Sequence, residues 1–302
     1  MRVDPNYLTN LASSLDQTQV AEQQLTSELS SGVRVTSLSQ DPVASGENVL
    51  LLNQIQRDDS FTQSSSLVTG QLQVADSALG QVVSQLNTAI SLATSANNAT
   101  LNASDLKSIS NQIAGIRAEV TSLANSNYQG QYIFGGGQSS TAPFSTSNAT
   151  SPAVTSYNGG EDVNYLQTPN GQSIQLNVPG DQIFAASGAN SVFAALNNLV
   201  ADYSSGTASS TAVADTQALG TALNYVSQQR VTIDNSLSRL NAASDAVASE
   251  KTQLTVAQTN LMQADVAQVS TQLSLAETQQ AALEAVISQL GSESTSLFSK
   301  IQ

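Results

Sequence analysis

The chain has 302 residues, with 23 Asp and Glu against 9 Lys and Arg, a formal net charge of −14, and no His or Cys. Without Cys and His, the sequence excludes thiolate nucleophiles, disulfides, imidazole bases and the common zinc ligands. Nine cations also argue against a nucleic-acid partner, because phosphates are bound by clustered Lys and Arg. The composition favours a structural protein over an enzyme, and it predicts no catalytic residue, no cofactor and no metal.

Membrane insertion is not expected either. The longest aliphatic run covers residues 49–52, whereas about 20 apolar residues are needed to cross a bilayer. The first ten residues lack the apolar stretch of a cleavable signal. We therefore expect a protein that, if secreted, leaves the cell by a route that reads no such signal.

The first predicted helix ends at Ser30–Ser31–Gly32, where Gly32 supplies a left-handed cap. Its apolar stripe has the 3–4 spacing of a coiled coil and comprises Leu8, Leu11, Leu15, Thr18, Glu22, Leu25 and Leu29. A second helix is predicted from a ladder formed by Leu72, Ala75, Leu79, Val82, Leu86, Ala89 and Ala93. A third helix is predicted over 106–123, with Ser104 as its N-cap.

Short strands are predicted in the middle of the chain, at residues 132–134, 154–157, 164–167 and 173–178. The last two flank Asn170–Gly171, which supplies the positive φ of a hairpin turn. We expect a small β domain without a large sheet.

Three features of the middle and early chain resemble chemical sites but favour structural interpretations. The run Gly135–Gly137 lacks the Lys of a phosphate loop and is expected to be a flexible turn. The acidic pairs Asp58–Asp59 and Glu161–Asp162 fit no calcium loop and are expected on the solvated surface. Tyr132 and Phe134 could form a sugar-binding platform, but packing in a small core is favoured.

The C-terminal arm is predicted to be helical with a break. One apolar ladder runs to Leu261, and a second resumes one residue out of phase, so the packing partners are expected to change near Asp265. An unbroken helix over 211–290 would be about 120 Å long. Polar residues occupy several stripe positions, namely Thr18, Glu22, Ser244, Gln258 and Gln280. We expect such thin stripes to become ordered only against partner molecules.

The predicted fold class is mainly α with a small β-rich insert. Long N- and C-terminal helices, in residues 1–129 and 190–302, would form an elongated, coiled-coil-like helical rod domain, and residues 130–189 would form an outward β domain.

Residues 25–57 resemble the N-terminal signature of bacterial flagellins and their junction relatives. The residues that carry this resemblance are Leu29, Ser30, Ser31, Gly32, Arg34, Val35, Ser39, Asp41 and Pro42. Relatives usually have an acidic residue at the position of Gln40. Within this superfamily, residues 130–144, 157–160 and 180–184 are similar to the hook-associated protein 3 group of hook–filament junction proteins, and residues 265–298 match that group more loosely.

The resemblance implies an extracellular structural adaptor of the bacterial flagellum, exported unfolded through the flagellar type III channel. Its implied partners are further copies in a ring, hook-associated protein 1, flagellin and a cytoplasmic export chaperone. The implied assembly interface comprises Leu25, Leu29, Ser30, Gly32, Arg34, Val35, Asp41, Pro42, Val266, Val269, Leu273, Leu283, Leu290, Leu297 and Phe298. Three alternatives remain: flagellin itself, a secreted coiled-coil adhesin, and a glycosidase that uses two carboxylates, for which the sequence offers no evidence.

Overall fold

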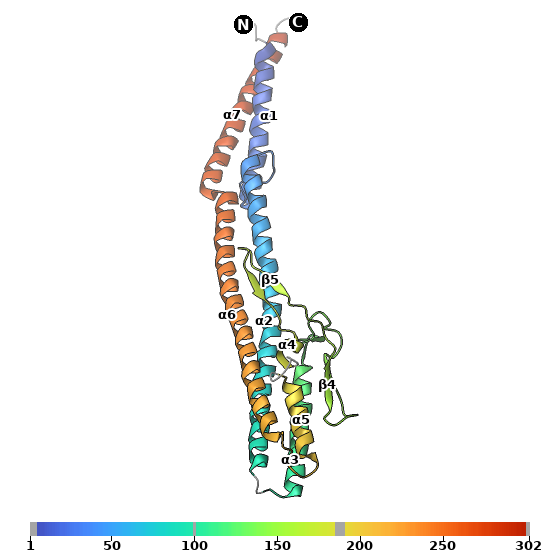
Figure 1. Cartoon of the computed structure of the whole chain (residues 1–302). Helices are drawn as coiled ribbons and strands as arrows, with labels where there is room; N and C mark the ends of the chain where they lie inside the picture. Colours follow the sequence, from blue (N-terminus) through green and yellow to red (C-terminus); the bar gives the residue numbers. More distant parts are fainter. Residues whose placement is uncertain (1–4, 99–100, 185–190, 300–302) are drawn as a thin grey trace. The chain divides into compact units, whose positions relative to one another are not determined.

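The chain is mainly α-helical, as the sequence predicts (Figure 1). A computed structural model describes residues 5–98, 101–184 and 191–299. The four longest helices are α1 (Pro5–Ser31), α2 (Pro42–Asn97), α6 (Ala212–Met262) and α7 (Val266–Ser299). The chain forms two compact units, one built from residues 1–56 and 250–302 and the other from residues 57–249. Each unit is described by itself below.

Within residues 57–249, α2 and α6 run antiparallel. Asp76 forms an ion pair with Arg230 at 2.5 Å, and Asn97, at the end of α2, donates to the hydroxyl of Thr216 at 3.1 Å near the start of α6. The predicted ladder of α2 is confirmed, because all seven of its members are buried: Leu72, Ala75, Leu79, Val82, Leu86, Ala89 and Ala93. This apolar face is the largest contribution of one helix to the core.

Helix α3 (Ala103–Ala124) packs beside α5 (Val192–Ser204). The expected N-cap of α3, Ser104, is wrong: the cap is Asn102, whose side chain accepts from the amides of Ser104 and Asp105. The Asp105 carboxylate reaches back to the Asn102 amide and completes a capping box. Asn caps a helix as well as Ser does. Asn102 is favoured over Ser104 because it has an acidic residue, Asp105, three positions later that completes the capping box.

The strands form three separate two-stranded antiparallel sheets instead of one β domain. The pairs are β1 (Asn127–Tyr128) with β2 (Gln131–Tyr132), β3 (Phe144–Ser147) with β4 (Val154–Tyr157), and β5 (Tyr165–Gln167) with β6 (Ser173–Gln175). The hairpin around Asn170–Gly171 is confirmed, and Gly171 has the positive φ, 82°. The prediction missed β1 and β3. Each of these two short strands is held by hydrogen bonds to its partner strand. A segment this short shows little preference for a strand in its own sequence, so it could not be predicted alone.

Aromatic rings fill the space between the strands and the short helix α4 (Gly180–Phe184). Phe134 meets Phe184 edge-to-face at 5.4 Å between centroids, and Phe144 lies 5.1 Å from Phe193. Phe134 is 1 % exposed, so it packs in the core and offers no platform to a sugar. The neighbouring turn at Gly135–Gly137 is tightly packed, because a Cβ atom on Gly136 would overlap the backbone carbonyl of Gly160.

The two acidic pairs differ from each other. Glu161 and Asp162 are exposed, as predicted, whereas Asp58 is buried and only Asp59 is exposed. Successive residues of a helix point about 100° apart, so adjacent carboxylates on α2 meet different environments. No helix among the described residues combines the length and apolar character required for a membrane span.

The α2 ladder predicts a large stability difference between two leucines of one helix. Leu86→Ala should lower the free energy of unfolding by about 2–5 kcal/mol, because it leaves a cavity at a fully buried site. Leu67→Ala, at a side chain that is 48 % exposed, should cost well under half as much. Urea unfolding followed by circular dichroism measures both, and equal losses would contradict the assigned core.

Candidate functional site

The most informative site is the break between α6 and α7. Helix α6 ends at Met262, α7 begins at Val266, and the connection is Gln263–Ala264–Asp265. The predicted break in the C-terminal arm near Asp265 is therefore confirmed. The connection contains neither Gly nor Pro, so contacts from elsewhere in the chain must help to end α6.

Those contacts come from residues 32–41, the segment between α1 and α2, which we call the strap. The Arg34 amide donates to the Met262 carbonyl at 2.7 Å, and the Ala264 amide donates to the Gly32 carbonyl at 3.0 Å. Val33 and Gln263 form an antiparallel bridge between these bonds. Gly32 has φ +68°, which a residue with a side chain rarely adopts, and its amide closes the end of α1 by donating to Glu28. The strap thus supplies partners to backbone groups that a continuing helix would have paired internally.

Arg34 connects the end of α6 with the start of α2. Its Nη2 donates to the Leu261 carbonyl at 3.3 Å, and both Nη1 and Nη2 donate to Asp41 at 3.2 Å. A guanidinium at a helix C-terminus lies where the exposed carbonyls carry partial negative charge. Its several donors in one plane allow Arg34 to serve a carbonyl and a carboxylate together, which Lys does less well.

Asp41 is the N-cap of α2. Its Oδ1 accepts from the Ala44 amide at 2.9 Å, and Pro42 occupies the first helical position, where a missing amide costs nothing. The sequence prediction that Gly32 ends one helix and Asp41–Pro42 begins the next is confirmed. The bond from Ala44, together with the Arg34 guanidinium, holds the pKa of Asp41 below its ordinary value. The cap therefore stays charged until the pH falls below the usual range of an aspartate.

Gln40 organises the turn inside the strap. Its Oε1 accepts from the Thr36 amide at 2.7 Å, the Thr36 hydroxyl at 3.0 Å and the Ser37 amide at 3.1 Å. An amide oxygen makes all three bonds without a charge. The departure from the acidic residue of the family pattern therefore keeps the acceptor and removes only its charge. Sequence reasoning identified the departure but not this role.

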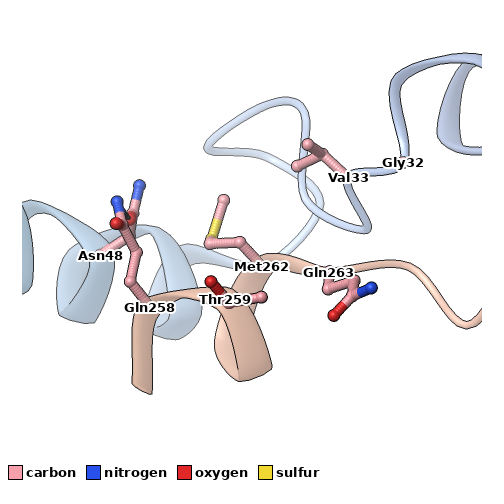
Figure 2. Close-up of a pocket in the computed structure, with 7 residues that line it drawn as sticks. All are labelled: Gly32, Val33, Asn48, Gln258, Thr259, Met262 and Gln263. Atoms are coloured by element: carbon pink, nitrogen blue, oxygen red, sulfur yellow. Dashed lines mark hydrogen bonds between the residues drawn. The ribbon is translucent and has the colours of Figure 1, made fainter. Parts of the chain in front are cut away.

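A pocket of about 380 Å³ lies beside the strap (Figure 2). The side chains of Val33 and Met262 give it an apolar wall, and Gln258 donates to Asn48 at 2.9 Å along its edge. Its lining residues carry no charge: Gly32, Val33, Asn48, Gln258, Thr259, Met262 and Gln263. Across the described part of the chain, no three His, Cys, Asp or Glu converge as metal ligands. Such a pocket suits an uncharged side chain better than an ion or a phosphate.

Helices α1 and α7 lie side by side (Figure 1). Among the predicted interface residues of α1, Leu25 is half-buried and lines a groove with Leu275 and Ala276. Leu29 is 36 % exposed, and Glu28 is buried in its place, where it accepts from Gln24 at 3.0 Å. The assignment of Leu29 to the buried stripe of α1 is therefore wrong, because the stripe drifts by one residue in the last turn.

The predicted residues of α7 form one face along much of the helix. Val269 is buried, Leu273, Leu283 and Leu290 are half-buried, and Val266 is 54 % exposed. Of the remaining interface residues, Val35 is buried, and Ser30 and Pro42 are exposed. The side chains of Leu297 and Phe298 lie outside the described residues.

Sequence reasoning missed an exposed apolar surface that begins in the strap and continues along the start of α2. Leu38, Val43 and Leu50 are exposed by 68 %, 71 % and 69 %, and Val49 by 55 %. The sequence shows Val49–Leu52 as its longest aliphatic run, but it does not show which of these side chains face the solvent. We call Leu38, Val43, Val49 and Leu50 the apolar strap surface.

Arg34→Ala should loosen the strap without unfolding the protein. The side chain is partly exposed, so the loss in stability should be about 1 kcal/mol. The backbone amides of residues 34 and 264 should then exchange with solvent about five times faster, because their acceptors are less firmly held. Hydrogen exchange with mass spectrometry measures this, with Arg57→Ala, an exposed arginine of α2, as the matched control. Unchanged exchange at both amides would show that Arg34 does not hold the strap.

Comparison with known proteins finds similar sequences that include residues 32–41. The model for the bacterial flagellin N-terminal helical region matches residues 6–139. The chain is 30 % identical over 181 residues to Flagellar hook-associated protein 3 of Salmonella typhimurium, covering 60 % of this chain and 55 % of that protein. The protein of the same name from Escherichia coli is 30 % identical over 166 residues, covering 55 % of this chain and 50 % of that protein. The chain thus spans about half the length of these relatives.

Two solved structures share the fold. A putative flagellar hook-associated protein from Vibrio parahaemolyticus aligns with a TM-score of 0.65 and 18 % identity, over 74 % of this chain and 100 % of that one. Flagellar hook-associated protein 3 from Legionella pneumophila aligns with a TM-score of 0.61 and 14 % identity, over 70 % and 98 %. The chain therefore contains a region similar to the bacterial flagellin N-terminal helical region, and it shares the fold of these two structures.

Proposed function

We propose that this protein is a structural junction protein of the bacterial flagellum. In this proposal it forms a ring between hook-associated protein 1 and the flagellin filament. The observation that carries the proposal is the strap closed over the end of α6, in a chain whose named relatives are hook-associated proteins. A protein that holds long helices at a fixed break is suited to stacking against copies of itself and against similar subunits.

The apolar strap surface supports a role in assembly. Four large aliphatic side chains are exposed there, next to a pocket with an apolar wall. Large apolar side chains that are exposed within one short segment are found where a protein binds another protein. The half-buried stripes of α1 and α7 are also incompletely covered, so neighbouring subunits could bury more of both.

The location and remaining partners follow from the same proposal. The protein would act outside the cell after export through the flagellar channel, and a cytoplasmic export chaperone would bind it beforehand. Residues 1–129 and 190–302 would build the assembly core, and residues 130–189 would face outward. We propose no catalytic role, cofactor, nucleic-acid partner or membrane insertion.

A deletion strain tests the junction proposal against flagellin itself. Without a junction protein, cells should keep their hooks, lose their filaments and release intact flagellin into the medium, because export continues while polymerisation has no base. Without flagellin, none would be released. Electron microscopy of the cells and immunoblotting of the medium distinguish these outcomes. Normal filaments in the deletion strain would instead favour the adhesin alternative.

Single charges on the predicted interface should block assembly. Leu29→Asp or Leu283→Asp places an unpaired carboxylate where subunits would meet, so filament growth should stop while export continues. The readouts are motility and the amount of variant protein in the medium. Leu67→Asp is the matched control, because it adds the same charge at an exposed leucine outside the predicted interface. Normal filaments with either interface variant would contradict the assigned surface.

A further inference from the structure

The side chain of Met262, the last residue of α6, lies in the joint that the strap closes. It is half-buried and forms part of the wall of the pocket of about 380 Å³, where Figure 2 shows it between Asn48 of α2 and Val33 of the strap. All three residues belong to the unit of residues 1–56 and 250–302. Because this side chain lines a pocket and is not fully buried, small molecules in the solvent can reach its sulfur atom.

The backbone of the same residue holds the strap. The Met262 carbonyl accepts from the Arg34 amide at 2.7 Å, and two positions later the Ala264 amide donates to the Gly32 carbonyl at 3.0 Å. A change in the chemistry of the Met262 side chain therefore takes place next to both backbone bonds that join α6 to the strap.

Met262 is the most readily oxidised side chain in the described part of the chain. Thiols and thioethers are the side-chain groups that peroxides oxidise most readily, and the sequence has no Cys. It also has no Trp or His, and its other methionine is Met1, which lies outside the described residues. A peroxide that enters the pocket therefore meets one reactive sulfur.

We propose that Met262 is an oxidation site and that its sulfoxide loosens the strap. Hydrogen peroxide supplies the oxygen: its O–O bond breaks, one oxygen bonds to the sulfur of Met262, and the other leaves as water. The sulfur loses two electrons and the peroxide gains them, so the step needs no further reactant. The product is methionine sulfoxide, which methionine sulfoxide reductases convert back to methionine.

The sulfoxide does not fit the apolar wall that Met262 forms with Val33. Oxidation makes a flexible apolar group polar, and its oxygen is costly to bury without a hydrogen-bond donor. Several donors of the lining residues already have acceptors: the Gly32 amide at Glu28, the Val33 amide at Ser31, the Gln258 side chain at Asn48, the Thr259 hydroxyl at Thr255 and the Gln263 amide at Thr259. To use one of these donors, the sulfoxide has to break an existing bond.

The other ways to satisfy the sulfoxide also separate it from the strap. The side-chain amide of Asn48 can donate, but Figure 2 shows Asn48 across Met262 from Val33, so this bond draws the side chain toward α2. Gln263 is exposed, so its side-chain amide competes with water for the sulfoxide. In each case Val33 loses the apolar side chain beside it, and the neighbouring backbone bonds open more often.

The test oxidises the full chain with hydrogen peroxide. Peptide mapping by mass spectrometry should find the added oxygen on Met262. The Arg34 and Ala264 amides should then exchange about three to five times faster with solvent deuterium, because the bonds they make open more often. The Leu176 amide, which donates to Asn164 in the unit of residues 57–249, should exchange as before. Methionine sulfoxide reductases should restore the slow exchange.

Two variants separate oxidation of Met262 from other effects of peroxide. Met262→Leu keeps an apolar side chain of similar volume without sulfur, so peroxide should leave the exchange of its strap unchanged. Met262→Gln places a polar side chain in the wall, so its strap should exchange fast before any treatment. Both variants keep Met1, so oxidation there affects them equally.

Three results would overturn the proposal. If Met262 stays reduced while Met1 is oxidised, the pocket does not admit peroxide. If the oxidised protein shows unchanged or slower exchange at Arg34 and Ala264, the sulfoxide finds donors without disturbing the strap. If Met262→Leu responds to peroxide as the wild type does, the effect arises elsewhere in the chain. None of these measurements depends on the assembly of flagella.

Discussion

The structure of the terminal unit depends on how the carbonyl groups at the end of α6 are satisfied. A helix leaves its last carbonyls without internal partners, and the connection to α7 contains no residue that ends a helix by itself. The strap supplies the missing donors through the amide and the guanidinium of Arg34. Because Asp41 holds the same guanidinium while it caps α2, one ion pair fixes the end of one long helix relative to the beginning of another.

Polar residues on the helical stripes are a second feature of this chain. Ser244 hydrogen bonds to Ser65 at 2.5 Å, and Gln258 donates to Asn48 at 2.9 Å, so polar groups on facing helices satisfy each other. Each pair stabilises one alignment of the two helices, since a shift by one turn would separate the partners.

Local signals explain what the sequence could predict. Gly32 and Asp41–Pro42 were identified correctly because capping depends on residues within four positions, and the α2 ladder because seven spaced apolar residues define a face. The backbone acceptors of Arg34 at Leu261 and Met262 could not be predicted, since a backbone carbonyl has no residue type to recognise. Asp58 was misjudged and the burial of Glu28 was missed for a related reason: the burial of a charged side chain is decided by elements distant in the sequence.

The strap also constrains the order in which the protein can fold. The hydrogen bond from Arg34 to Leu261 joins residues 227 positions apart, so the loop it closes covers most of the chain. Closing so long a loop costs entropy that only the completed contacts recover. A chain that folds from its N-terminus can form α1 and α2 early, but the segment between them has no acceptors to bind until α6 is in place. The signature closest to the start of the sequence is thus among the last parts to acquire its structure.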